Sequence, residues 1–353
     1  MASHDCATVQ LCCCTSILSL YLTWDILLLL VLLLFIIVVA IVIIIIVVFM
    51  CFSISQNKLT AILKHYDKND NYDNSSDCQF HYSFDFAQQV HLPHSPLQVG
   101  PLYFLVPRKV GIFGVCAEGL PQQINYLIDE GMSSGKGSNM VISLLHHFLE
   151  NYGLGEKHIH IHCDNCAGQN KNKFVMWYLA WRIMRGLHTS ISVNFMPAGH
   201  TKFAPDWCFG LLKRKFIVCE VHCLADMCHV VETSSTRGIN KAQLVGTETQ
   251  ENIVAVYDWQ TYFHGCCRAL KGIKSNYHFR FTADSLGTVF YKRKLDDVEF
   301  SFQLCNSAET VQQRLAQMPA EVAPPGLSQA RQEYLRHFIR PFVRSDKQDI
   351  LCP

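Results

Sequence analysis

A long stretch near the start of the sequence lacks charge, glycine and proline. Every residue from Ile26 to Phe52 is apolar. As a helix, a run of about 27 residues would be roughly 40 Å long, whereas a bilayer core of about 30 Å needs only about 20 residues. The excess implies a tilted helix or one that continues into the interface. A buried core helix would carry a polar face and this run has none, so it predicts one transmembrane helix.

The run also lacks the features of a cleaved signal peptide. The apolar part of such a peptide has about 7 to 15 residues and precedes small residues at the cleavage site, but this run ends in Met-Cys-Phe-Ser at 50–53. No Lys or Arg precedes it, whereas Lys58, Lys64 and Lys68 follow. The positive-inside rule therefore places the large C-terminal part in the cytosol. If residues 1–56 were only translated low-complexity sequence, the nucleus would be the expected compartment.

The sequence has no disulfide framework. Its 17 cysteines are scattered and often adjacent, unlike the spacing in small secreted domains. We therefore expect free thiols and a reducing compartment for the main domain. Zinc binding is the alternative for two groups: the pair Cys163 and Cys166, and the cluster of Cys219, His222, Cys223, Cys228 and His229. Buried thiols beside a surface histidine are the preferred interpretation.

The sequence has no overall excess of charge of either sign. There are 30 Lys and Arg against 29 Asp and Glu, a net charge of +1, which says nothing about a nucleic-acid partner. The distribution is uneven, because only one acid, Asp206, lies between Lys171 and Lys215. The basic residues of that segment are Lys171, Lys173, Arg182, Arg185, Lys202, Lys213, Arg214 and Lys215. Such a patch suits a phosphate backbone, and an ordinary solvated surface is an equal alternative.

Composition and periodicity divide the chain into five segments, without an internal repeat. Residues 1–56 carry the apolar run, and residues 57–78 form a polar linker. Strands and helices alternate in 79–218. Short strand-like runs in 219–310 predict an added β-rich subdomain, and 311–353 contains a last helix and a tail.

The periodicity of 79–218 predicts five strands and three helices. The strands are expected at 79–86, 103–117, 123–128, 158–163 and 190–196, and the helices at 138–152, 172–187 and 205–218. Farther along, strands are expected at 253–257, 278–281 and 288–291, and a helix at 329–342. The order β-β-β-α-β-α-β-α argues for a mixed sheet with helices on its faces. It is also the order of ribonuclease-H-like domains.

Two aspartates lie where this topology places catalysis. Asp85 is late in the first strand on its polar face, and Asp164 directly follows the fourth. In a ribonuclease-H-like sheet these strands are parallel neighbours, so both carboxylates would meet at one end. Asp206, near the start of the third helix, could complete a set of three, although Asp164 could equally lie in a simple turn and Asp206 could merely favour its helix N-terminus.

Three carboxylates suit a pair of Mg²⁺ or Mn²⁺ ions, because hard cations prefer oxygen ligands. Two such ions about 3.5 to 4 Å apart can activate a water or 3′-hydroxyl and stabilise the leaving oxygen of a phosphodiester. The other candidates for the third acid are Glu220, Asp226 and Glu232. Glu220 is the main rival of Asp206, but it lies roughly 20 Å farther along a continuous helix. Helical spacing also puts Phe209, Gly210 and Lys213 on the side of Asp206, with Gly210 expected to permit close approach.

Two long motifs resemble an uncharacterised domain family of transposon-derived animal proteins. They are DNCAGQNKN at 164–172 and GHTKFAPDWCFGL at 199–211; shorter matches lie at 83–89, at 111–116 and in the tail at 326–353. The resemblance covers about 79–353. That family is similar to DDE/D transposases with a ribonuclease-H-like fold. The resemblance implies metal-dependent cleavage and strand transfer of DNA.

The resemblance also implies roles for single residues. Asp85 and Asp164 would bridge the two ions, and Asp206 would bind one of them. The residues expected to contact nucleic acid are Gln169, Asn170, Lys171, Lys213 and Lys215. Expected partners are DNA, membrane lipid along residues 26–52 and a second copy of the chain. Since the usual N-terminal DNA-binding segment is replaced by the apolar run, a non-catalytic membrane protein that uses the domain as an interaction scaffold is the alternative.

Overall fold

A mixed ten-stranded sheet organises the part of the chain that the structure describes. The computed structural model describes residues 79–97, 100–197, 199, 202–305, 315 and 317–353. The predicted transmembrane helix at 26–52 and the linker at 57–78 lie outside them. Among the described helices, none is long and apolar enough to cross a membrane.

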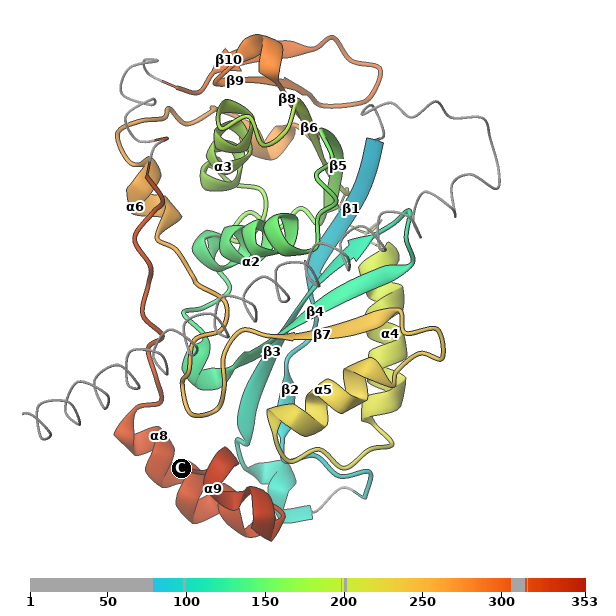
Figure 1. Cartoon of the computed structure of the whole chain (residues 1–353), viewed down its shortest axis with the longest axis vertical. Helices are drawn as coiled ribbons and strands as arrows, with labels where there is room; N and C mark the ends of the chain where they lie inside the picture. Colours follow the sequence, from blue (N-terminus) through green and yellow to red (C-terminus); the bar gives the residue numbers. More distant parts are fainter. Residues whose placement is uncertain (1–78, 98–99, 198, 200–201, 306–314, 316) are drawn as a thin grey trace, which may run out of the picture. The chain divides into compact units, whose positions relative to one another are not determined.

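The strand order across the sheet is β10-β9-β8-β6-β5-β1-β3-β4-β7, with β2 beside β3 (Figure 1). The strands are β1 (Gln79–Phe86), β2 (Val90–Leu92), β3 (Arg108–Ala117), β4 (Gln122–Asp129), β5 (His158–Cys163), β6 (Ser190–Phe195), β7 (Asn240–Leu244), β8 (His278–Thr282), β9 (Thr288–Lys292) and β10 (Phe300–Gln303). Strands β1, β5 and β6 run parallel to one another. Strands β1, β3 and β4 pair antiparallel.

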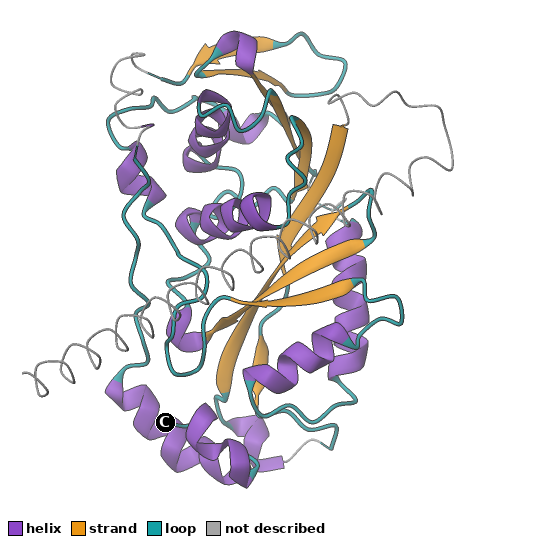
Figure 2. Ribbon diagram, in the orientation of Figure 1, coloured by secondary structure: helices purple, strands orange, loops and turns teal. Residues whose placement is uncertain are grey.

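Helices cover both faces of this sheet (Figure 2). The α-helices are α2 (Ser138–Asn151), α3 (Lys173–Met184), α4 (Ala204–Phe216), α5 (Leu224–Glu232), α6 (Trp259–Phe263), α8 (Gln329–Tyr334) and α9 (Gln348–Leu351). Helices α2 and α3 bury their apolar side chains with Tyr82 and Phe84 of β1. Helices α4 and α5 pack on the other face with Ile112 and Leu127. The expected mixed sheet with helices on its faces is confirmed.

The described strands of the segment 219–310 extend the central sheet. Strand β7 joins one edge, parallel to β4, and β8 joins the other edge, antiparallel to β6. By their contacts, the described residues belong to one compact unit. The strand-like pattern of this segment therefore reflects burial against the edges of a sheet that earlier residues begin.

Two predicted strands differ from the structure. The segment 103–117 is not one strand: Gly100–Phe104 forms a 3-10 turn and the strand starts only at Arg108, because Pro107 has no N–H for the ladder. The segment 253–257 is not a strand either. The backbone N–H groups of Ile253 and Val254 both donate to Val245 O, which no regular ladder permits, although Val254 is fully buried.

The C-terminal helix predicted at 329–342 is confirmed with a change of pitch. Helix α8 continues into a π-turn at Leu335–Ile339 and a 3-10 turn at Arg340–Phe342. The π-turn keeps Leu335 and Ile339 fully buried in the cluster beneath α4 and α5.

A buried arginine connects α3 to α2 and to the start of β6. Arg182 Nε donates to His188 Nε2 at 2.9 Å, and Arg182 Nη1 donates to Glu150 Oε1 at 2.9 Å. His188 Nδ1 lies 2.9 Å from the carbonyl oxygen of Glu156. His188 must therefore be neutral and protonated on Nδ1, so that Nε2 can accept. Burial, and next the charge of Arg182, lower the pKa of His188 to about 4.

This network predicts acid-sensitive stability. Because the pKa of His188 is about 4 when folded and about 6.5 when unfolded, the unfolded chain binds more protons between those values. The contribution is complete above pH 6.5 and is lost as the pH falls toward 4, at no more than about 1.4 kcal/mol per pH unit. Urea unfolding of His188→Gln between pH 7 and 4.5 should show a shallower pH dependence than wild type. The exposed His337→Gln should keep the wild-type slope, and an equal slope in His188→Gln would contradict the assignment.

Candidate active site

Asp85 and Asp164 leave neighbouring parallel strands at the same end. Strands β1 and β5 pair with Phe84 opposite Cys163. Asp85 is the residue after Phe84, and Asp164 is the residue after Cys163. Phe84 and Cys163 are buried on the face covered by α2 and α3. Since side chains alternate along a strand, the two aspartates point to the other face, where both are half-buried.

Helix α4 brings Asp206 to this region. The helix packs against β1 and β3, and Asp206 lies in its first turn, where Oδ2 accepts from the backbone N–H of Phe203 at 3.4 Å. Gly114 lies opposite Asp85 in β3. A Cβ at Gly114 would be 2.7 Å from the ring of Phe209, so only glycine lets α4 approach the sheet this closely.

The sequence predicts that Gly210 permits the close approach of α4, but the approach occurs at Gly114. A Cβ added at Gly210 would meet nothing within 4 Å. Phe209 follows Asp206 by nearly one helical turn, and its ring packs over the glycine. This packing fixes the distance of the Asp206 backbone from the strand that carries Asp85.

The three carboxylates interact electrostatically. The pKa of Asp85 is raised to about 7. Burial contributes most, and the negative charges of Asp164 and Asp206 add to it, while the Phe86 N–H, at 2.7 Å from Oδ1, acts in the opposite direction. Acids that share a site repel one another and hold protons to higher pH. A divalent cation bound beside these carboxylates would relieve that repulsion.

The carboxylates are more widely spaced than the ligands of a single ion. Among the described residues, the one group of three or more His, Cys, Asp or Glu with all ligand atoms within 4.8 Å of one another is His81, Glu118 and His162. Asp85, Asp164 and Asp206 do not form such a group. The cysteines and histidines of 219–229 likewise form no such group.

The motif at 164–172 is a turn that orients Asp164. Asp164 Oδ1 accepts from Asn170 Nδ2 at 2.5 Å and from the backbone N–H of Cys166 at 3.1 Å. The N–H groups of Asn170 and Lys171 both donate to Cys166 O. Asn172 then caps α3, because its Oδ1 accepts from the backbone N–H of Phe174 at 3.0 Å. Asn170 is buried, so it positions the carboxylate rather than reaching a nucleic acid.

Lys171 is buried, which contradicts its expected contact with phosphate. The residue is only 2% exposed. Its Nζ donates to Lys274 O at 2.9 Å and lies 4.0 Å from the centroid of the Tyr277 ring. Burial lowers the pKa of Lys171 to about 8. The lysine therefore joins the turn after β5 to the segment before β8.

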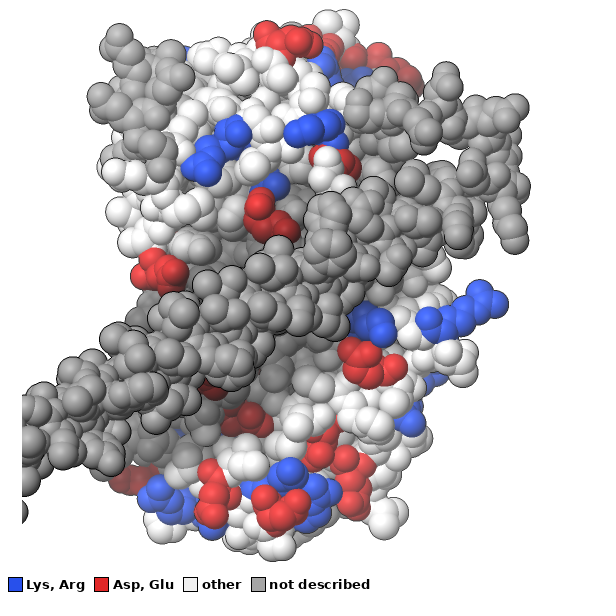
Figure 3. All heavy atoms as spheres, in the orientation of Figure 1, with Lys and Arg blue, Asp and Glu red and all other residues white. Residues whose placement is uncertain are grey.

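The basic patch predicted between Lys171 and Lys215 is not one surface. Arg182 is buried like Lys171, whereas Lys202, Lys213 and Arg214 are exposed and Gln169 and Lys215 are half-buried. On the face in Figure 3, the visible basic and acidic side chains of the described residues are interspersed.

A groove of about 680 Å³ extends from Asp206 along α4. Residues of α4 form one wall, and the segments around β2 and the 3-10 turn at 100–104 form the other. Asp206, Phe209 and Lys213 all line it, which confirms that they share one side of the helix. Lys215 is not among its lining residues.

The rival third ligands have other partners or positions. Glu220 is exposed and follows the end of α4 at Phe216. Asp226 Oδ2 accepts from the backbone N–H of His222 at 2.9 Å at the start of α5. Glu232 Oε1 accepts from the N–H of Ala242 at 2.8 Å.

Comparison with known proteins gives a family but no activity. Residues 107–297, more than half of the chain, match the family described as "Domain of unknown function (DUF7869)". No curated protein and no solved structure matches the chain. The matched region contains Asp164 and Asp206 and begins after Asp85. The chain therefore belongs to the DUF7869 family.

Proposed function

We propose that the protein is a metal-dependent phosphodiester-cleaving domain related to DDE/D transposases, with DNA as its substrate. Asp85, Asp164 and Asp206 would hold two Mg²⁺ or Mn²⁺ ions. The observation that carries the proposal is the parallel pairing of β1 with β5, which brings Asp85 and Asp164 to one end of the sheet beside the first turn of α4.

The topology supports a ribonuclease-H-like assignment. The five central strands run β4-β3-β1-β5-β6. Strands β1, β3 and β4 come first in the sequence, and neighbours among them pair antiparallel. Strands β5 and β6 come next and run parallel to β1. Helices α2, α3 and α4 follow β4, β5 and β6 in turn. Because one fold serves many functions, the topology supports the location of the site, and the carboxylates support the chemistry.

The proposed roles follow from the positions of the side chains. Asp85 and Asp164, on adjacent strands, and Asp206, on α4, would together hold the ions. Bound ions of this kind activate a water or 3′-hydroxyl and stabilise the leaving oxygen. Asn170 holds Asp164 in place through its 2.5 Å hydrogen bond. Lys213 lines the same groove as Asp206 and would neutralise a phosphate of the bound strand.

A cleavage assay with the purified full-length chain tests this function. Supercoiled plasmid and labelled duplex DNA would be incubated with Mg²⁺, Mn²⁺, Ca²⁺ or EDTA. We expect nicking with Mg²⁺ or Mn²⁺ and none with EDTA. Mn²⁺ binding would be followed in parallel by electron paramagnetic resonance. Absence of both cleavage and Mn²⁺ binding would overturn the proposal and favour an interaction scaffold without catalysis.

A further inference from the structure

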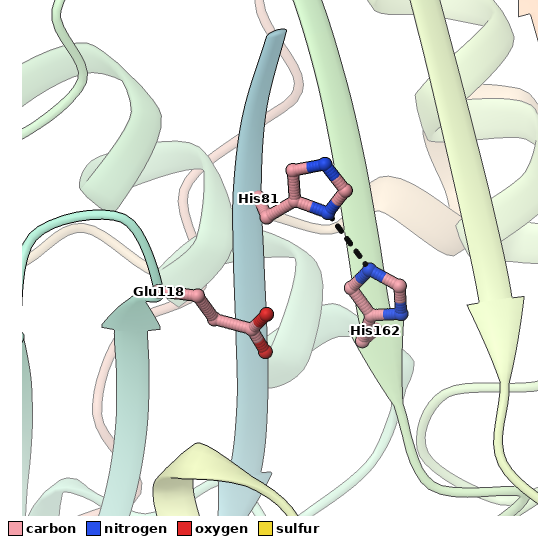
Figure 4. Close-up of side chains that lie close together, drawn as sticks. All are labelled: His81, Glu118 and His162. Atoms are coloured by element: carbon pink, nitrogen blue, oxygen red, sulfur yellow. Dashed lines mark hydrogen bonds between the residues drawn. The ribbon is translucent and has the colours of Figure 1, made fainter. Parts of the chain in front are cut away.

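A second group of ligand atoms lies on the face of the sheet that also carries the aspartates. His81 belongs to β1, His162 to β5, and Glu118 directly follows β3. Figure 4 shows the three side chains pointing toward one another from these adjacent strands. Their positions are set by strand register: His162 lies opposite Ser83, two residues beyond His81, and the N–H of Glu118 donates to His81 O at 2.9 Å.

The spacing of the two imidazole nitrogens matches the coordination shell of one ion, and the Glu118 carboxylate lies close beside them. His81 Nδ1 and His162 Nε2 are 3.2 Å apart, and all three ligand atoms lie within 4.8 Å of one another. A tetrahedral ion with bonds of about 2.0 to 2.1 Å separates two nitrogen ligands by roughly 3.3 Å. The imidazoles therefore already stand at the required distance, and a metal ion would replace their mutual hydrogen bond.

Neighbouring side chains hold the histidines in this arrangement. The ring of His160 stacks on His81, with centroids 4.6 Å apart and planes within 10°. His160 Nε2 in turn lies 3.1 Å from Gln79 Oε1. All of these residues project from paired β-strands, and ligands on rigid strands are placed more accurately than ligands on loops.

The ligand types indicate which ion fits. Two imidazoles and one carboxylate are a common zinc set, and three protein ligands leave a fourth position for water. Mg²⁺ prefers oxygen ligands, so the aspartates and this group select different ions. His81 and Glu118 are exposed, so an ion can enter from solvent. His81 precedes Asp85 by four residues, roughly 13 Å along a strand.

We propose that His81, His162 and Glu118 form a second metal site that binds Zn²⁺, distinct from the three-aspartate centre. The site takes one ligand from β1, one from β5 and one from the turn that directly follows β3. It keeps one coordination position open toward solvent. The proposal does not depend on the nuclease activity.

The test is a Co²⁺ titration of the metal-stripped full-length protein. Co²⁺ substitutes for Zn²⁺ and gives visible absorption when four-coordinate. We expect one saturable site whose signal Zn²⁺ displaces and a tenfold excess of Mg²⁺ does not. His162→Gln and Glu118→Gln should each weaken Co²⁺ binding at least about tenfold. Loss of a group that only orients a metal ligand already weakens binding by about 10- to 100-fold. His91→Gln, an exposed histidine on β2, is the matched control and should bind like wild type.

Two further variants separate this site from the alternatives. The double variant Asp85→Asn/Asp164→Asn should keep the Co²⁺ signal, because it changes only the aspartate centre. Cysteine ligands would add strong near-ultraviolet charge-transfer absorption, which this site should lack. Unchanged Co²⁺ affinity in His162→Gln, loss of the signal in the double aspartate variant, or a thiolate spectrum would each overturn the proposal. Melting temperatures without metal will show that the variants fold.

Discussion

Replacing Asp164 by Asn is expected to reduce metal-dependent DNA cleavage by about 10³-fold, because an ion in such a site contributes several kcal/mol to the barrier. The amide keeps the size of the side chain, and its Oδ1 can still accept from Asn170 and Cys166 as Asp164 does. The fold should therefore survive, and only the negative charge is lost. Asp85→Asn should lose activity to a similar extent.

Matched substitutions show whether the loss belongs to the site. Asp284→Asn makes the same change at an exposed acid after β8 and should cleave at the wild-type rate. Asp206→Asn should lose activity, whereas Glu220→Gln should not, since Glu220 lies beyond the end of α4. Initial rates of plasmid nicking at saturating Mn²⁺ give the comparison. Wild-type rates in Asp164→Asn would exclude the proposed centre. If Glu220→Gln lost activity and Asp206→Asn kept it, Glu220 and not Asp206 would be the third ligand.

The sequence was most informative where one face of a strand is buried and the other is polar. The predicted strands at 79–86 and 158–163 have the same bounds as β1 and β5, because apolar and polar side chains alternate throughout both. That alternation also placed Asp85 on the face opposite the buried side chains of Tyr82 and Phe84. Alternation alone does not show that the two strands are neighbours. That prediction came from the order of strands and helices, which is the order of ribonuclease-H-like domains.

Features that depend on distant residues could not be predicted in this way. Lys171 reads as a surface cation, but its partners Lys274 and Tyr277 lie about a hundred residues later. The close approach of α4 was assigned to Gly210 on its own helix, whereas Gly114 on β3 provides it. Periodicity gives the face of a side chain and not the element that packs there.

The group of His81, Glu118 and His162 shows the same limit. Alternation places His81 and His162 on the polar faces of their strands. Glu118 follows the end of β3 and has no periodic signal. Its place beside His81 results from the antiparallel register in which Ala117 lies opposite Tyr82.

The stability of the fold should depend strongly on one buried ion pair at the start of β3. Arg108 and Asp129 are 0% and 1% exposed. Arg108 Nη2 lies 2.7 Å from Asp129 Oδ1, and Arg108 Nε lies 2.8 Å from Oδ2. Arg108 Nη1 also donates to the carbonyl oxygen of Leu351 at 2.8 Å. The pair thus joins β3, β4 and the C-terminal tail.

Asp129→Asn is expected to lower the free energy of unfolding by about 3 to 5 kcal/mol, because it leaves the guanidinium buried without its counter-charge. The matched control is Asp349→Asn. Asp349 accepts from Arg340 Nη2 at 2.6 Å, but its side chain is 89% exposed, and a surface pair contributes about 0 to 1 kcal/mol. Urea unfolding at pH 7 measures both changes. Arg108→Met/Asp129→Leu should recover part of the loss, since it removes both charges together. Equal effects of Asp129→Asn and Asp349→Asn would show that burial of the pair does not determine its contribution.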